Sequence, residues 1–234
     1  HQVQRRSFLC HFFSPVVDEW GGTTYSLTTA GYTALVVIML ACLLIGCAVF
    51  GGKKKFSAKQ LAFSAMAIAL AMVTSMIKLV HMPMGGSVTL LSMLFITLIG
   101  YWFGLGAGLT TGVAYGILQL VIDPYILSVP QMLVDYIFAF GALGLAGIFW
   151  KNKSRYAVIF CYIAGVLGRY VFAFISGWIF FGMYAADYGF SSPVVYSLLY
   201  NGAYIFLEAA ITIVILFIPP VNKALTYVKE IAAK

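Results

Sequence analysis

One acidic side chain stands out because its neighbours are apolar. Asp135 lies in the stretch PQMLVDYIFAF, residues 130–140, which otherwise has the composition of a membrane helix. A carboxylate inside a membrane is costly, so we expect it to have a partner or a function. A later stretch, VVYSLLYNG, supplies Tyr196 and Asn201. A carboxylate and a carboxamide can recognise the donor and acceptor edge of a heterocycle, and tyrosine faces attract a cation, so these residues favour binding of a small aromatic cation.

Aromatic side chains accompany these polar groups at the same expected depth. Tyr196, Tyr200 and Tyr204 are spaced four residues apart and therefore share one side of a helix. Such a stripe in a membrane helix is more often a belt at the lipid–water interface than a ligand site. The acid and the amide nearby favour the ligand-binding interpretation.

The sequence lacks the motifs of several enzyme classes. It contains no G-x-x-x-x-G-K-[ST] loop for nucleotide phosphates and no H-E-x-x-H motif for zinc. A two-aspartate intramembrane protease is also excluded, because Asp135 has no acidic partner at its depth in a neighbouring span. We therefore expect a binding protein rather than an enzyme, with no cofactor and no metal.

The elements that must position these residues are membrane helices. Of the 234 residues, 62% are hydrophobic and only 9% are charged, whereas a soluble domain has about 25% charged residues. A spanning helix needs about 20 mainly apolar residues. The sequence therefore predicts an all-α integral membrane protein with spans at residues 27–50, 57–80, 88–103, 107–122, 130–150, 156–182 and 193–218.

Two of these stretches, 88–103 and 107–122, are short and rich in glycine. Small residues let helices approach closely, so the segment GLGAGLTTG, residues 104–112, predicts tight packing there. The alternative is a break within one of the two helices.

The basic residues predict an orientation. If Lys59 faces the cytoplasm, seven spans place the cations of residues 151–155 and 223–234 on the same side. Because Lys and Arg concentrate on the cytoplasmic side, we expect the N-terminus outside and the C-terminus inside. The net charge of +7 then reflects topology and contact with the lipid bilayer, with no nucleic-acid partner.

Two further charges are expected near the middle of the membrane. Arg169 in GVLGRYVF and Glu208 in YIFLEAA fall near the midplane on adjacent spans. An unpaired charge at that depth would be costly. We therefore expect Arg169 and Glu208 to form a structural ion pair.

The order of several motifs resembles a known family. LVDY, GRYVFAFISGWIFFGMYA and VVYSLLYNG, preceded by HMPMGGSVTLL and TGVAYGILQ, are similar to the thiamine-specific S component of energy-coupling-factor (ECF) transporters. The resemblance covers residues 57–220 and implies a six-helix substrate-binding core. Residues 27–50 would then be an extra transmembrane helix, residues 1–26 an extracellular segment, and residues 221–234 a basic cytoplasmic tail.

The resemblance also implies a function. Such a subunit lies in the plasma membrane of a prokaryote, captures thiamine outside, and delivers it inward with an ECF transmembrane coupling subunit and two ATPase subunits. By position, Asp135 would bind the aminopyrimidine ring, Tyr136 would be its aromatic neighbour, and Tyr196 and Asn201 would complete the pyrimidine contacts. The family's further aromatic positions correspond to Tyr115 and Phe181.

Two other parts of the family's mechanism have counterparts in this chain. The loop PMGGSV corresponds to a lid over the site, formed by Gly85, Gly86 and Ser87, and glycines suit a hinge. Ala65 and Ala69 align with an alanine pair through which the family docks its partner subunit.

The docking assignment has an alternative. Ala67 and Ala71 form a second pair of small residues on the same helix, and either pair is equally suited to ordinary tight packing within the chain.

One position departs from the family. Many members have a histidine where this chain has Ala173, so one polar contact to the ligand is missing. A thiamine precursor or another vitamin is therefore an alternative ligand. A membrane structural or assembly protein would fit the composition equally well and would bind no small molecule.

Overall fold

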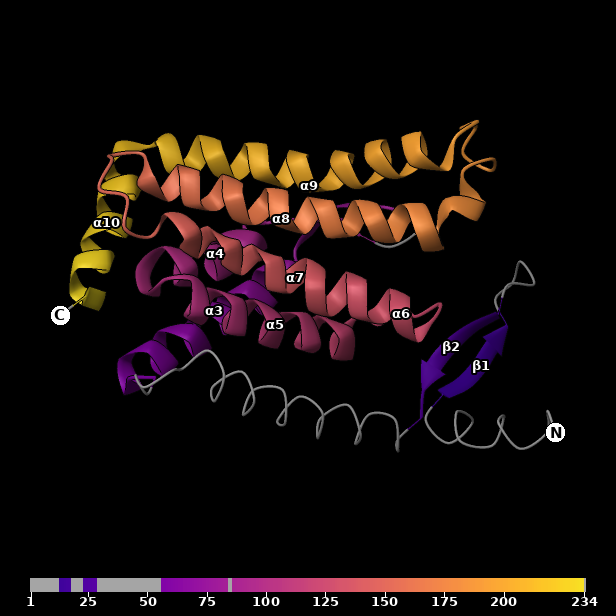
Figure 1. Ribbon diagram of the computed structural model, residues 1–234, viewed down its shortest axis with the longest axis horizontal. Coiled ribbons are helices and arrows are strands. Elements are labelled where there is room, and N and C mark those ends of the chain that lie inside the picture. Colours follow the sequence, from indigo (N-terminus) through magenta and orange to yellow (C-terminus); the bar gives the residue numbers. More distant parts are fainter. Residues whose placement is uncertain (1–12, 18–22, 29–55, 84–85, 234) are drawn as a thin grey trace.

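The computed structural model describes residues 13–17, 23–28, 56–83 and 86–233. Its body is a bundle of helices lying side by side (Figure 1). Five helical segments are long and apolar enough to cross a membrane, and a shorter apolar helix accompanies them, which confirms the expected all-helical membrane core. These segments are α3 (Ala58–Ser75), α4 (Ser92–Phe103), α5 (Leu105–Ile122), the composite span Val129–Phe149, α8 (Ala157–Phe180) and α9 (Pro193–Phe217).

The part of the chain before α3 is described only in two strands. β1 (Phe13–Val17) pairs antiparallel with β2 (Thr23–Leu27), a hairpin that the sequence analysis did not predict. The extra transmembrane helix predicted at residues 27–50 lies outside the described residues except for its first two positions, so it stays a prediction.

A second unpredicted hairpin connects α3 to α4. It consists of β3 (Lys78–His81) and β4 (Ser87–Thr89), which pair antiparallel. Consequently α3 ends at Ser75, before the end of the predicted span at residue 80. The helix α3 begins at Ala58, one residue after the predicted start, and Ser57 and Gln60 form a capping box there.

The hydrophobic core is centred on α4, the shortest of the apolar helices. It is surrounded by α3, α5, α8 and the last part of the composite span. Met93 and Ile96 of α4 are fully buried and belong to one cluster with Tyr162 of α8 and Ile205 of α9. The other helices therefore face lipid on one side, whereas α4 is enclosed by protein.

The span that carries Asp135 is not a regular α-helix. After one α-helical turn, α6 (Val129–Met132), it widens into a π-helical stretch, η1 (Leu133–Phe138). A short α-helical turn, α7 (Ala139–Gly141), leads into a tight 3-10 helix, η2 (Ala142–Phe149). π-helical turns inside helices are rare and often lie at functional sites.

Glycines allow this composite span to lie directly on the backbone of α5. Gly144 and Gly147 recur at the three-residue period of the 3-10 helix, and a Cβ added to Gly144 would come within 2.2 Å of the Leu109 amide nitrogen. Nearer the π-helical stretch, a Cβ on Gly116 would come within 1.9 Å of the Tyr136 carbonyl oxygen. Tight packing of the glycine-rich segment is therefore found, and α5 is unbroken.

The last helix, α10 (Pro219–Ala233), runs across one end of the bundle (Figure 1). Trp102 Nε1 donates a hydrogen bond to the Leu225 carbonyl oxygen at 3.1 Å, and Lys59 Nζ donates to the Ile231 carbonyl oxygen at 3.1 Å. The predicted basic tail is therefore a helix held against the ends of α3 and α4. We call this end of the bundle the tail end.

We predict that Gly116→Ala destabilises the protein, because the new methyl group would overlap the Tyr136 carbonyl. Overpacking typically costs about 1–3 kcal/mol. The measurement is thermal unfolding of the purified protein in detergent. The matched control is Gly202→Ala in α9, where the nearest atom to an added Cβ lies 3.5 Å away. Equal unfolding temperatures for the two variants would contradict the close contact.

Candidate functional site

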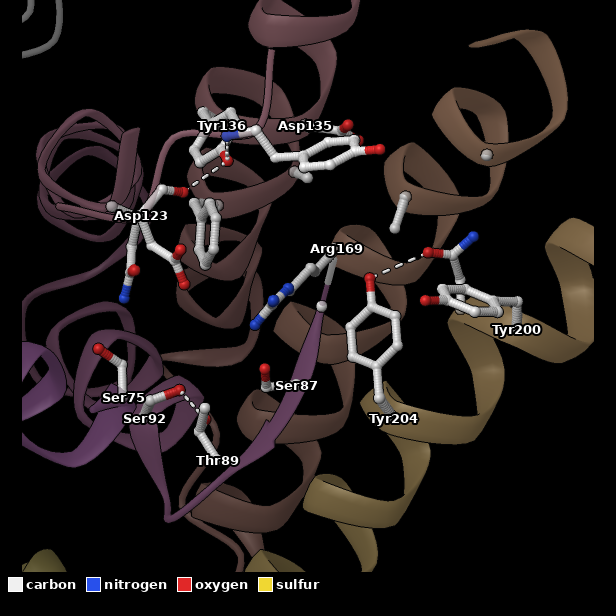
Figure 2. Close-up of a pocket in the computed structure, with 18 of the residues that line it drawn as sticks. Ser75, Ser87, Thr89, Ser92, Asp123, Asp135, Tyr136, Arg169, Tyr200 and Tyr204 are labelled. Carbon is white, nitrogen blue, oxygen red and sulfur yellow. Dashed lines mark hydrogen bonds between the residues drawn. The ribbon is translucent and has the colours of Figure 1, made fainter. Parts of the chain in front are cut away.

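A cavity of about 420 Å³ lies at the end of the bundle opposite α10, within the range of about 300–1,000 Å³ typical of small-molecule sites. Its walls come from the end of α3, the β3–β4 hairpin, the end of α5, the start of the composite span, α8 and α9. Figure 2 shows side chains from these elements pointing toward one another around the cavity. We call this end of the bundle the cavity end.

The residues predicted to contact a ligand all line this one cavity. They are contributed by α5, the composite span, the end of α8, and α9, which are far apart in the sequence. Their contact with a ligand stays a prediction. The residues are Asp135, Tyr136, Tyr196, Asn201, Tyr115 and Phe181.

Asp135 is oriented by a buried amide. Gln131 Nε2 donates a hydrogen bond to Asp135 Oδ2 at 2.6 Å, and it also donates to the Tyr125 carbonyl oxygen at 3.1 Å. The Gln131 side-chain oxygen accepts from the Leu127 amide at 3.0 Å, which fixes the amide in place. Within the described residues, no cation lies at ion-pair distance from Asp135. The carboxylate is therefore held in position and available to a donor or a cation in the cavity.

The hydroxyl and the ring of Tyr136 make different contacts. Its hydroxyl donates to the Asp123 carbonyl oxygen at 2.9 Å and accepts from the Tyr125 amide at 2.8 Å. The hydroxyl therefore holds the loop between α5 and α6 in place. The ring faces the cavity, 6.3 Å from the ring of Phe140.

Tyr196 presents a hydroxyl that the described residues do not satisfy. Its ring stacks on Tyr188 with a centroid distance of 5.7 Å and lies 5.3 Å from the ring of Tyr200. The hydroxyl is buried and has no hydrogen-bond partner among the described residues. Buried polar groups are nearly always paired, so this hydroxyl needs a partner beyond the described residues, as do the hydroxyls of Tyr162 and Ser176, which do not line the cavity.

Asn201 is already engaged within α9. Its Nδ2 donates to the Ser197 carbonyl oxygen at 3.1 Å and to Ser197 Oγ at 3.2 Å, while its Oδ1 accepts from the Tyr204 hydroxyl at 2.9 Å. A ligand that bonds to Asn201 must therefore exchange one of these contacts.

Tyr115 and Phe181 provide aromatic walls. Tyr115 is fully buried, its hydroxyl accepts from Gln119 Nε2 at 2.6 Å, and its ring meets Phe140 edge-on at 5.2 Å. Phe181 stacks on Tyr125 with a centroid distance of 5.8 Å. The cavity therefore has aromatic walls beside its polar groups.

The predicted ion pair between Arg169 and Glu208 is wrong. Glu208 is buried and instead accepts hydrogen bonds from the amide and hydroxyl of Thr89, the hydroxyl of Ser92 and the amide of Met93, at 2.7–3.2 Å. The free amides at the start of α4 need such an acceptor, and no side chain at the helix's own cap position supplies one. Glu208 thereby ties α9 to both β4 and α4.

Arg169 belongs to the cavity instead. Its guanidinium lies over the ring of Phe140, with Cζ 4.4 Å from the ring centroid, and its side chain points into the middle of the cavity (Figure 2). In the part of the chain that the structure describes, no carboxylate pairs with it. A cation–π contact partly replaces the missing counter-charge.

The predicted lid corresponds to the β3–β4 hairpin. Gly86 and Ser87 line the cavity, whereas Gly85 lies outside the described residues. Gly86 has a φ of +77°, and a Cβ there would come within 2.8 Å of the Tyr204 ring. The hairpin therefore rests directly on an aromatic side chain of the cavity wall.

An ion pair joins this hairpin to the opposite rim of the cavity. Lys78 Nζ of β3 lies 2.5 Å from Asp123 Oδ2, at the end of α5. Both side chains are partly exposed, and such pairs contribute about 0–1 kcal/mol. The pair is therefore a weak link compared with the four hydrogen bonds, two of them buried, that Glu208 accepts.

Comparison with known proteins relates the chain that forms this cavity to a protein family. Residues 61–228 match the sequence profile of the family described as thiamine transporter protein (Thia_YuaJ). The chain belongs to this thiamine transporter family. Thiamine transporter ThiT of Bacillus subtilis (strain 168) is 38% identical over 170 residues, which cover 66% of this chain and 85% of that protein. A solved structure of ThiT from Listeria monocytogenes matches with a TM-score of 0.58 at 26% identity, covering 70% of this chain and 96% of the other.

Membership of the thiamine transporter family confirms the resemblance seen in the motifs. The departure at Ala173 concerns the site directly, because Ala173 lines the cavity. Sequence reasoning missed Gln131 as a site residue, although its position four residues before Asp135 places it on the same side of the helix. No comparable signal pointed to Arg169 as a residue of the cavity.

We predict that Glu208→Gln lowers the stability of this transporter-family protein. Glutamine keeps the shape of the side chain but brings an N–H group against the amides of Thr89 or Met93, so at least one buried hydrogen bond is lost. An unsatisfied buried group costs about 1–3 kcal/mol. The measurement is thermal unfolding in detergent, with Glu230→Gln on exposed α10 as the control. If both variants unfold at the wild-type temperature, Glu208 does not have the anchoring role.

Proposed function

We propose that this chain is the substrate-binding subunit of a thiamine importer and that its cavity binds thiamine. The observation that carries the proposal is the oriented carboxylate of Asp135 in a cavity lined with aromatic side chains. An ionised carboxylate accepts hydrogen bonds from the amino group of a pyrimidine, and charge-assisted bonds of this kind are the strong ones.

The remaining contacts of thiamine follow from the charges in the cavity. The buried Tyr196 hydroxyl supplies a further hydrogen bond to the pyrimidine ring. The thiazolium ring carries a positive charge, so it is attracted by Asp135 and by aromatic faces and repelled by Arg169. We therefore place the thiazolium ring beside the aromatic face of Phe181 and away from the Arg169 guanidinium.

We further propose that the cavity end faces outward and the tail end faces the cytoplasm. Cations gather at the tail end, in agreement with the positive-inside rule, whereas the cavity end has Lys78 together with Asp123 and Asp187. The cations described at the tail end are Lys59, Lys151, Lys153, Arg155, Lys223 and Lys229. This orientation puts the C-terminus in the cytoplasm of a prokaryotic cell, as in the sequence analysis.

The transport step requires partners in this proposal, because the sequence has no nucleotide-binding loop. The chain would bind rather than catalyse, and an ECF coupling subunit with two ATPases would drive release. The two alanine pairs of α3 differ in exposure: Ala67 and Ala71 are buried against the bundle, whereas Ala65 and Ala69 are exposed. The exposed pair is the one free to dock a partner helix.

A thiamine precursor is a second candidate ligand, favoured by one position. Ala173 is buried in the cavity wall, where a histidine would have added a polar contact. A ligand that lacks half of the thiamine molecule would depend less on that contact. Titration with thiamine and with its separate pyrimidine and thiazole halves distinguishes the two candidates.

We predict that Asp135→Asn weakens thiamine binding about 10- to 150-fold, the equivalent of losing a hydrogen bond to a charged group worth about 1.5–3 kcal/mol. The measurement is isothermal titration calorimetry of the purified protein in detergent. Calorimetry is preferred to tryptophan fluorescence, because no tryptophan among the described residues lines the cavity.

The matched control for this prediction is Asp187→Asn, which removes an exposed acid that does not line the cavity. It should bind thiamine as the wild type does. Wild-type affinity in a folded Asp135→Asn variant would contradict the proposed role of Asp135.

We predict that the double variant Ala65→Trp, Ala69→Trp binds thiamine normally but loses uptake in cells. Bulky rings on this exposed face would block a partner helix without touching the cavity. The control is Met66→Trp with Leu70→Trp, a pair with the same spacing that is exposed on another side of α3 and should retain uptake. Normal uptake by the alanine-pair variant would disprove the docking assignment.

A further inference from the structure

A second cavity, of about 550 Å³, lies at the tail end, far from the one described above. Its walls are the segment 153–156 before α8, the end of α9 and one side of α10. None of its lining residues is shared with the first cavity. Its chemistry therefore has to be explained separately.

Cations from two distant parts of the chain meet in this second cavity. Lys153 and Arg155 come from the segment before α8, and Lys223 comes from α10. Glu230 is the single acid that lines the cavity. Among the described residues none of these cations forms an ion pair, and three cations against one acid leave the cavity with an excess of positive charge.

Apolar and aromatic groups lie immediately beside these cations. Phe217 is the last residue of α9 and is exposed, and its ring lies 5.9 Å from that of Tyr156. The Arg155 guanidinium lies over the Tyr156 ring, 5.8 Å from its centroid. Tyr227 of α10 is exposed on the same cavity. The cavity therefore has a cationic side and an apolar side.

The position of the cavity matches the surface of a bilayer. The apolar helix α9 ends at Phe217, and α10 begins at Pro219 and runs across the bundle end (Figure 1). A membrane-spanning helix leaves the hydrocarbon region where its apolar stretch ends. The cationic side thus lies at the depth of lipid head groups, with Phe217 on the hydrocarbon side.

We propose that this cavity binds the phosphate head group of an anionic phospholipid, with the acyl chains lying along Phe217 and Tyr156. Lys153, Arg155 and Lys223 contact the phosphate, and basic pockets of this kind recognise anionic lipid. The apolar side argues for a lipid over free phosphate, which would gain nothing from exposed aromatic rings. The inference does not depend on the identity of the ligand in the first cavity.

The test is native mass spectrometry of the full chain in detergent, titrated with phosphatidylglycerol and, separately, with phosphatidylcholine. The triple variant Lys153→Gln, Arg155→Gln, Lys223→Gln should bind phosphatidylglycerol at least tenfold more weakly than the wild type, because each cation near a phosphate contributes about fivefold. Phosphatidylcholine binding should be weaker than phosphatidylglycerol binding in the wild type and unaffected by the substitutions.

A matched pair of single variants separates this site from general surface charge. Arg155→Gln removes a cation that lines the cavity, whereas Lys151→Gln removes an exposed cation four residues earlier that does not. Only the first should weaken binding, about fivefold. Equal effects of the two variants, or an unchanged triple variant, would overturn the proposal.

Inorganic phosphate provides the last arm of the test. It should fail to displace phosphatidylglycerol at equal concentration, and displacement would identify a site for a soluble anion and overturn the lipid assignment. Thermal unfolding of the triple variant in detergent checks that the protein is folded. Loss of phosphatidylglycerol binding at an unchanged unfolding temperature supports the proposal.

Discussion

The whole arrangement depends on one contact, in which the backbone of the composite span lies on the backbone of α5. The Gly144 and Gly116 positions have no room for even a methyl group. The span packs tightly both in its 3-10 part, at Gly144, and in its π-helical part, at Tyr136. Near the cavity end it turns Asp135 and Gln131 toward the cavity. The position of the acid is therefore fixed by glycines that never touch the cavity.

The sequence predicted the residues of the cavity better than the contacts among them. Asp135, Tyr196 and Asn201 could be found because polar groups in an apolar run are costly and need a reason. The expected depth in the membrane led to the wrong pairing of Arg169 with Glu208, because depth does not determine the direction in which a side chain points from its helix. The amides at the start of α4 compete for the same carboxylate, and that competition becomes visible only when β4, α4 and α9 are brought together.

The parts of the fold that are determined by hydrophobicity were predictable. The parts that are determined by local backbone geometry were not. The apolar runs located α5, α8 and α9 to within a few residues, because a membrane helix must cover about 20 positions. The π-helical and 3-10 stretches have the same composition as an α-helix and left no such signal. The β3–β4 hairpin was also missed, since Lys78–His81 continues the apolar run of α3 with little interruption.

The helix α9 contacts the cavity, the β3–β4 hairpin and α10. Tyr196 and Asn201 near the start of α9 line the cavity, Tyr204 lies beneath Gly86 of the hairpin, and Glu208 holds the strand that follows. Past Phe217 the same chain turns into α10 on the other side of the bundle. These attachments link the two ends of the bundle through one helix. A displacement of α9 would therefore be felt both by the hairpin at the cavity end and by α10 at the tail end.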